Sequence, residues 1–366
     1  MSVNAERPDD PGVAGLGGGA GAVRSLPISK VTVLGAGSWG TTVASLFAKK
    51  TNTILWARSE STAAEVDTMH TNSAYLGDRP LSESLKAYSN LEKATAGADL
   101  LVIAVPSHGF RSILEASRGF VGENTRVLSL AKGIEAGSLR RMTQIIEEIL
   151  PGHSFGFLTG PNLASEVIDG QPTASVIASS DPKMSLEIQR ILHSPTMLIY
   201  TNPDVIGCEL AGALKNVIAI AAGMAEGLGF GDNSRAALIT RGLAEMGRLG
   251  VAAGGRPLTF AGLAGLGDLV ATCTSPRSRN HYVGRQLGLG RRLDEVLDEM
   301  KMVAEGVKTA PVAVRLGELF DVGMPISSEI AKVISGESTA GQAVAALLNR
   351  ETGAEMEGIE MEGMDK

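Results

Sequence analysis

The chain has 366 residues, 44% of them hydrophobic and only 4% aromatic, a length that allows two domains with cores built mainly of Ala, Val, Ile and Leu. Lys and Arg total 33 against 40 Asp and Glu, and the resulting net charge of -7 argues against a surface for nucleic acid or acidic membranes. An anionic substrate would therefore need a local basic pocket. The two cysteines, Cys208 and Cys273, lie among apolar or small residues, which is typical of reduced thiols in a cytosolic protein. The sequence contains no cluster of Cys and His with metal-ligand spacing, so we expect no metal site.

Both ends of the chain have the composition of solvated tails. Residues 1–29 are rich in Gly, Pro, Asp and Ala and lack the features of a secretory signal, so we predict a disordered tail. The acidic, Gly-punctuated end predicts a second flexible tail over residues 351–366. The apolar stretch 217–225 is far shorter than the ~20 residues that span a bilayer. We predict a buried helix there and no stable membrane insertion.

From residue 30 to residue 203, short β-rich runs alternate with helical stretches. This alternation predicts a Rossmann-like α/β domain whose doubly wound sheet is mostly parallel. The predicted strands cover residues 30–36, 52–57, 85–88, 99–106, 126–131, 155–160, 174–180 and 197–202. Residues 204–350 have helical periodicity interrupted by Gly-rich turns, which predicts an all-α second domain.

The first predicted strand runs into Gly35, Gly37 and Gly40, and a helix follows. In this context the first glycine permits a tight turn, the second lets the backbone approach a pyrophosphate, and the third lets helix and strand pack closely. A similar pattern at residues 15–21 has no strand before it. We therefore predict a dinucleotide site at Gly35–Gly40.

Arg58 and Ser59 follow the second strand, where an NAD-selective site usually carries an acidic residue. A guanidinium suits a 2′-phosphate, so the predicted cofactor is NADP or NAD, with NADP at least tolerated. The alternative is that Arg58 is only a solvated charge at the end of a strand.

The exit of the fourth strand reads "VPSH". Pro106 and Ser107 either line the nicotinamide or begin a helix with Ser107 as its N-cap. His108 has no carboxylate partner evident nearby, so we interpret it as a structural or cofactor-flanking residue.

Two further strand exits carry candidate residues. Lys132 either reaches a bound anion or carbonyl or is an ordinary solvated lysine. At the next exit, Gly160 and Asn162 offer backbone and amide donors, and Ala164 permits close approach at the start of a helix.

Lys215 interrupts an otherwise apolar helix, where an isolated ammonium group is costly to bury and needs a compensating partner. A desolvated lysine with a lowered pKa can exchange a proton with a substrate hydroxyl or carbonyl. The alternative is a lysine that extends from a helix end to the solvent. The segment "GLGDLVATCTSPRSRN" offers Asp268 to pair with Lys215, with Thr272 and Asn280 beside it, and Arg279 to bind a phosphate.

These motifs resemble those of the NAD(P)-dependent glycerol-3-phosphate dehydrogenases of bacterial type. The matching strings are "GAGSWGT", "AVPSH", "AKGIE", "GPNLASE", "LKNVIAIAAGMAEGLGFGDNSRAALITRGLAEM", "GLGDLVATCTS" with "SRN", and "VAEGVKT". They occur in the family's order between residues 30 and 348. The resemblance implies reversible reduction of dihydroxyacetone phosphate to sn-glycerol 3-phosphate, which supplies phospholipid synthesis. It also implies a cytoplasmic homodimer.

The resemblance further implies roles for individual residues. Lys215 resembles the proton donor and acceptor, Lys132 the lysine that touches both cofactor and substrate, and Asp268 the aspartate beside them. The implied substrate-binding residues are Lys132, Gly160, Asn162, Lys215, Asp268, Thr272, Ser278, Arg279 and Asn280. The implied cofactor-binding residues are Gly35, Gly37, Ser38, Trp39, Gly40, Arg58, Pro106, Lys132, Ala164, Arg279, Val303 and Glu305. Asn162 departs from the family, which often has a hydroxyl residue there.

Two other functions compete with this one. Another two-domain Rossmann hydroxyacid dehydrogenase would also pair a nucleotide domain with a lysine-bearing helical domain, but it would act on carboxylates. A catalytically silent nucleotide sensor would bind the cofactor without turnover. If activity requires a phosphate on the substrate, the carboxylate dehydrogenase is excluded. If the protein turns over any substrate, the silent sensor is excluded.

Overall fold

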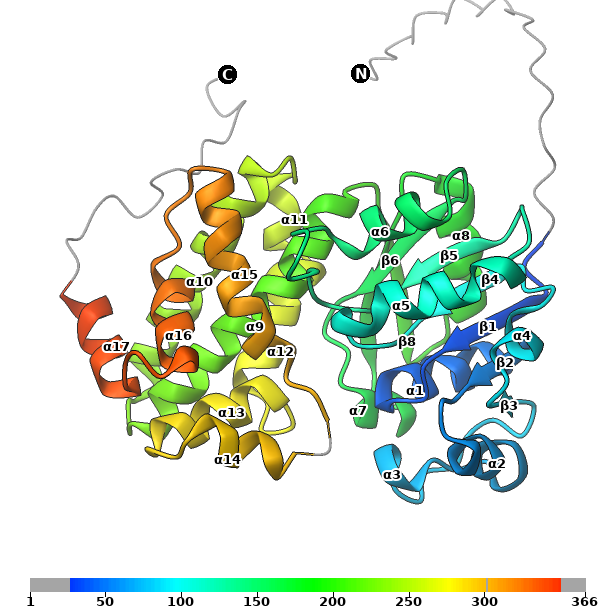
Figure 1. Ribbon diagram of the computed structural model, residues 1–366, viewed down its shortest axis with the longest axis horizontal. Coiled ribbons are helices and arrows are strands. Elements are labelled where there is room, and N and C mark those ends of the chain that lie inside the picture. The colour runs from blue at the N-terminus through cyan, green and yellow to red at the C-terminus, as the bar shows by residue number, and fades with distance from the viewer. Residues whose placement is uncertain (1–26, 301, 350–366) are drawn as a thin grey trace, which may run out of the picture.

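The computed structural model describes residues 27–300 and 302–349. An α/β half and a helical half lie side by side, as Figure 1 shows. The last strand of the α/β half ends at Asn202 and the first helix of the other half begins at Val205. The predicted tails lie mostly outside the described residues. Of the segment 1–29, Ile28 is buried and Ser29 donates hydrogen bonds to Asp99, so the folded part begins before Lys30.

One eight-stranded sheet forms the core of the α/β half, in the order β3-β2-β1-β4-β5-β6-β7-β8. All neighbouring strands are parallel except the antiparallel pair β6 and β7, which confirms the prediction of a mostly parallel sheet. The strands are β1 (Lys30–Leu34), β2 (Asn52–Trp56), β3 (Lys86–Tyr88), β4 (Leu100–Ile103), β5 (Arg126–Ser129), β6 (Phe155–Thr159), β7 (Thr173–Ala178) and β8 (Met197–Asn202). The strand order reverses direction between β1 and β4, and sheets of this kind bind ligands at that point, outside the carboxyl ends of the strands.

Helices cover both faces of this sheet. They are α1 (Ser38–Ala48), α2 (Glu60–Met69), α3 (Ser73–Leu76), α4 (Leu91–Thr95), α5 (Ser107–Ser117), α6 (Met142–Ile149), α7 (Ala164–Ile168) and α8 (Pro182–Leu192), with a 3₁₀ turn at Arg118–Phe120. Leu100 and Val102 of β4 belong to a core shared with α1 and α8, whereas Leu101 and Ile103 belong to a core shared with α5 and α6. A strand buried on both faces needs continuous apolar residues, which explains the apolar runs in the sequence.

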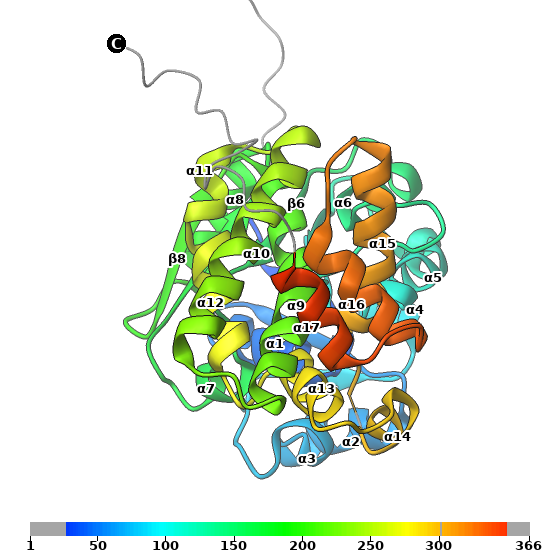
Figure 2. The ribbon, with the colours of Figure 1, turned by 90° about the vertical axis from the view of Figure 1, so that its left-hand side faces the viewer.

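The helical half is built around α9 (Val205–Gly227), against which α10, α12, α13 and α15 pack. Figure 2 shows α9 enclosed by its neighbours. The other helices are α10 (Asp232–Ala252), α11 (Pro257–Ala261), α12 (Asp268–Thr274), α13 (Arg279–Gly288), α14 (Leu293–Asp298), α15 (Glu305–Leu319), α16 (Pro325–Ser335) and α17 (Ala340–Leu348), with a π-helical turn at Leu263–Gly267. The close crossing of α9 and α13 requires Gly223, because a Cβ there would lie 2.1 Å from the His281 carbonyl oxygen.

Helix α9 is the one helix in the described part of the chain that is long and apolar enough to span a bilayer by length and composition. However, 94% of its apolar window is buried inside the protein. It is therefore a core helix, as predicted for residues 217–225.

Candidate active site

The turn from β1 to α1 has the geometry of a pyrophosphate site. Gly35 adopts a φ of +121°, which side-chain-bearing residues rarely reach. A Cβ at Gly40 would lie 2.0 Å from the carbonyl oxygen of Gly35, so the helix can approach the strand only with glycine there. Helix α1 begins at Ser38 without a side-chain cap and without an acidic residue in its first turn. Its N-terminal amides are thus left to bind an anion, which fits a dinucleotide.

Trp39 and Arg58 flank this turn. The indole Nε1 of Trp39 is buried without a hydrogen-bond partner among the described residues. Arg58 is exposed directly after β2 and forms no ion pair within the described ranges. Ser59, the N-cap of α2, accepts a hydrogen bond from the Thr62 amide. The side chains of Trp39 and Arg58 are therefore available to a ligand.

The exit of β4 contacts the helical half. Helix α5 begins at Ser107, so the helix-start interpretation of "PSH" is confirmed, but the N-cap position is held by Pro106 and not by Ser107. The Ser107 amide and hydroxyl donate to the Glu305 carboxylate at 3.0 and 2.6 Å. Arg279 Nη1 donates to the Val303 carbonyl at 2.9 Å. Three predicted cofactor residues therefore lie on one edge of the helical half, beside the nucleotide domain: Arg279, Val303 and Glu305.

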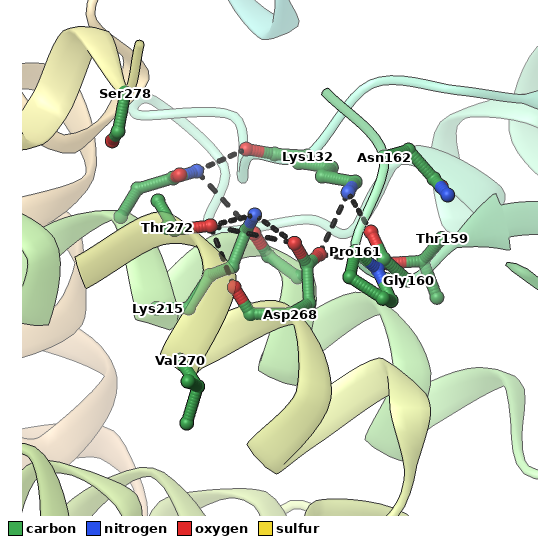
Figure 3. A network of polar contacts seen from close by, with 12 residues as sticks. Lys132, Thr159, Gly160, Pro161, Asn162, Lys215, Asp268, Val270, Thr272 and Ser278 are labelled. Atoms are coloured by element: carbon green, nitrogen blue, oxygen red, sulfur yellow. Dashed lines mark hydrogen bonds and ion pairs between the residues drawn. The ribbon is translucent and has the colours of Figure 1, made fainter. Parts of the chain in front are cut away.

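A buried carboxylate joins two lysines from different halves of the molecule, as Figure 3 shows. Lys215 of α9 donates to Asp268 Oδ1 and, at 2.6 Å, to the Thr272 hydroxyl. Lys132, which follows β5, donates to Asp268 Oδ2 at 2.7 Å and to the Gly160 carbonyl at 2.9 Å. Lys215 is only 5% exposed, so its ammonium group does not extend to solvent and Asp268 is the partner that its burial requires.

Burial and the neighbouring charges change the pKa values of Lys215 and Asp268. Burial lowers the pKa of Lys215 to about 8, a shift that the charge of Asp268 opposes and that of Lys132 reinforces. Burial alone would raise the pKa of Asp268, but the two ammonium groups hold it below its ordinary value. Two ammonium groups share one carboxylate, so the cluster carries a net charge of about +1, and loss of the Lys215 proton near pH 8 brings it to neutrality.

Asn216 is a site residue that the sequence interpretation missed. Its amide donates to the Lys132 carbonyl at 3.1 Å and its Oδ1 accepts from Asn280 at 2.8 Å. Asn280 in turn accepts from the Gly306 amide at 2.9 Å. The sequence contained a signal for Asn216, because a polar side chain in an apolar helix needs hydrogen-bond partners. This argument applies to Asn216 as well as to Lys215.

The remaining predicted residues lie around this cluster. The hydroxyl of Ser278, the N-cap of α13, accepts from the His281 amide. Ala164 begins α7, beside Asn162. The amide of Asn162 donates to the Ser175 hydroxyl of β7 at 2.7 Å. In this arrangement the amide donor anchors the loop and does not point toward the lysine cluster. His108 is exposed, and Arg277 forms an exposed ion pair with Glu166.

Among the described residues, no group of three or more His, Cys, Asp or Glu could hold a metal ion. A Rossmann sheet with a nucleotide turn, next to a buried lysine whose pKa is near neutral, defines a nicotinamide-nucleotide-dependent oxidoreductase. Two family models identify it more closely. The model described as NAD-dependent glycerol-3-phosphate dehydrogenase N-terminus matches residues 30–185, and the C-terminus model matches residues 204–345. The chain belongs to this family, as its motifs indicated.

Individual relatives agree with the family models. The chain is 51% identical over 326 residues to glycerol-3-phosphate dehydrogenase [NAD(P)+] 2 of Sphingopyxis alaskensis, covering 89% of this chain and 98% of that protein. It is 48% identical over 330 residues to the Mycobacterium avium enzyme, covering 90% and 97%. The crystal structure of the glycerol-3-phosphate dehydrogenase from Coxiella burnetii superposes with a TM-score of 0.85 at 36% identity, covering 88% of this chain and all of that one.

Proposed function

We propose that this protein reversibly reduces dihydroxyacetone phosphate to sn-glycerol 3-phosphate and thereby supplies glycerol phosphate for phospholipid synthesis. The observation that carries the proposal is the buried Lys215, held by Asp268 opposite Lys132 at the carboxyl ends of the strands. When bound, NADPH or NADH supplies the hydride for the C2 carbonyl carbon.

Lys215 acts as the general acid in the reducing direction. Its ammonium group gives a proton to the carbonyl oxygen, and the neutral amine takes it back from the hydroxyl in the oxidising direction. Asp268 keeps the ammonium in place, and Thr272 accepts a second of its three protons, which leaves one N–H for the substrate. Lys132 adds a second positive charge beside the oxygen that becomes negative during reduction.

Arg279 provides the cation for the substrate phosphate. It is exposed at the start of α13, where its Nη1 donates to the Val303 carbonyl and its charge interacts with the Glu305 carboxylate. A guanidinium with free N–H groups suits a phosphate. Asn280 is the neighbouring amide, and Gly160, Asn162 and Ser278 complete the proposed substrate site. The glycine turn, Ser38, Trp39, Arg58, Pro106, Ala164, Val303 and Glu305 are proposed to surround the cofactor.

We also propose that the protein works as a cytoplasmic homodimer, as the resemblance implies, and that the two halves are a nucleotide domain (30–203) and a substrate domain (204–350). The carboxylate-specific hydroxyacid dehydrogenase is not favoured, because the two family models together match most of the chain.

The test is an assay of NADPH and NADH oxidation with three substrates: dihydroxyacetone phosphate, unphosphorylated dihydroxyacetone and a 2-keto acid. We expect turnover with the phosphorylated substrate and at most a trace with the other two. Preference for the keto acid would instead support the carboxylate-specific alternative, and cofactor binding without any turnover would support the sensor.

A further inference from the structure

The loop between β5 and α6 presents Lys132 to the site and is fastened at both ends by helix α9. At its start, the Lys132 carbonyl accepts a hydrogen bond from Asn216 at 3.1 Å. At its end, Arg141 and Thr143 donate to the carboxylate of Glu209. Asn216 and Glu209 both belong to α9, so one helix of the substrate half holds both ends of one loop of the nucleotide half.

Glu209 is unusually well bonded for a contact between the two halves. The side chain is 3% exposed, and its oxygens accept from the Thr143 amide at 2.9 Å, the Thr143 hydroxyl and the Arg141 guanidinium. Because Thr143 lies in the first turn of α6, Glu209 caps that helix from the other half of the molecule. A buried carboxylate with three donors fixes its partners in position, since releasing any of them leaves a desolvated charge.

The two contacts come from one face of α9. Glu209 and Asn216 are seven residues apart, which is about two turns or 10.5 Å, and places both on one face of the helix. Inside the loop, Ile134 and Arg141 form a β-bridge, and Ile134 is buried in the core of the helical half. This bridge therefore joins Arg141 to a residue only two positions from Lys132.

We infer that Glu209 is a positioning residue for the reaction proposed above: it sets where the Lys132 loop lies along α9, and hence how Lys132 and Lys215 meet across Asp268. The inference rests on the proposed function. The hydrogen-bond partners of Glu209, Arg141 and Thr143, lie outside the proposed cofactor and substrate sites, so its effect belongs in the turnover of the bound complex and not in the affinity for the cofactor.

Glu245 provides a matched control. It is also a fully buried carboxylate that caps a helix, accepting from the Ile326 and Ser327 amides at 2.7 and 2.9 Å and from the Ser327 hydroxyl at 2.7 Å. Burial raises the pKa of both carboxyl groups. The hydrogen bonds of Glu245 join α10 to α16 within the helical half, and among the described residues none of them goes to the lysine cluster.

The experiment compares Glu209→Gln with Glu245→Gln in the full-length protein. The measurements are Tm, the Kd for NADPH by fluorescence titration, and kcat with saturating dihydroxyacetone phosphate. We expect both variants to lose thermal stability and to keep their cofactor Kd. Only Glu209→Gln should lose kcat, by about tenfold or more, because small displacements of catalytic groups are costly. Glu245→Gln should stay within about twofold of wild type, as expected for an effect on stability alone.

A second pair of variants, with smaller changes, keeps the test valid if a Gln variant does not fold. Thr143→Val removes one donor to Glu209, and Ser327→Ala removes the equivalent donor to Glu245. The first should lower kcat and the second should not. Equal kcat values in the matched pairs overturn the inference while leaving the proposed function intact. A wild-type protein that does not turn over dihydroxyacetone phosphate overturns the proposed function and the inference with it.

Discussion

Lys215 is buried, and it shares the single carboxylate of Asp268 with Lys132. If its proton is used in the transition state, Lys215→Met should lower kcat by roughly 10²-fold or more, because a general acid is lost. Met preserves the helix and the apolar packing, so the Kd for NADPH should persist. Steady-state kinetics and fluorescence titration measure both quantities. Near-normal kcat in a folded Lys215→Met protein would transfer the role to Lys132.

The pKa of Lys215 predicts opposite pH dependences for the two directions. Because burial lowers this pKa to about 8, the ammonium form needed for reduction disappears as the pH rises through about 8. The reduction kcat should therefore fall through this region. The oxidation kcat should rise through the same region, since it needs the neutral amine. Rate profiles in both directions check the signs, and two profiles that move in parallel would assign the titration to another group.

Arg58 is expected to favour NADPH, because it is exposed beside the glycine turn without an ion-pair partner among the described residues. Arg58→Asp should shift the ratio of kcat/KM values toward NADH by about tenfold or more, since a charge-assisted contact is worth about 1.5 to 3 kcal/mol. The measurement is kcat/KM with each cofactor. An unchanged ratio would mean that Arg58 is only a surface charge.

The individual site residues differ in how far the sequence could reveal them. Lys215 was identifiable because a lone cation in an apolar helix must be compensated, and Asp268 is the nearby acid that compensates it. The hydrogen bond from Asn162 to Ser175 depends on how β7 lies against the loop after β6, which no local pattern encodes. The link from Glu209 to α6 was missed for the same reason, because its partners lie 66 and 68 residues away.

At the scale of secondary structure, the β1–α1 unit depends on a backbone contact. Gly40→Ala would place a methyl group 2.0 Å from the Gly35 carbonyl oxygen and 2.8 Å from the Ala104 side chain. Helix α1 must then move away from the strand, so we expect the cofactor Kd to rise at least tenfold, together with a lower Tm. Gly37→Ala is the comparison for Tm alone, because a Cβ there meets no protein atom within 4 Å, whereas Gly37 itself belongs to the proposed cofactor turn. An equal loss of Tm in the two variants would contradict this explanation.

The sequence predicted all eight strands, because each is a short apolar run between turns, and it predicted a mostly parallel sheet, but it did not reveal which pair is antiparallel. The pair β6 and β7 is antiparallel although the helix α7 lies between them. Helix α7 has only five residues, too short for a crossover that returns the chain to the other end of the sheet. The fourth strand was predicted to continue to Pro106, which has no backbone N–H to donate to a neighbouring strand. Strand β4 instead ends at Ile103.

At the scale of the whole molecule, α9 organises both halves. Its Lys215 completes the lysine cluster, its Asn216 and Glu209 hold the Lys132 loop, and its remaining faces carry the core of the helical half. The lysine cluster therefore exists only when both halves are packed together. Because the site needs residues from both halves, a fold shared by many dehydrogenases can carry a site that is particular to one family.

The last prediction concerns the minimal chain that preserves this assembly. A protein shortened to residues 27–349 should keep the kcat of the full-length protein and its Tm within about 2 °C, because the described strands and helices and the lysine cluster lie in this range. Starting at Lys30 instead should lower the Tm, since it removes the buried Ile28 and the hydrogen bonds from Ser29 to Asp99. Thermal unfolding and turnover of the three proteins provide the comparison. If the chain of residues 27–349 loses turnover, a segment beyond it contributes to the active assembly. If the two shortened chains have the same Tm, the contacts of Ile28 and Ser29 contribute nothing to stability.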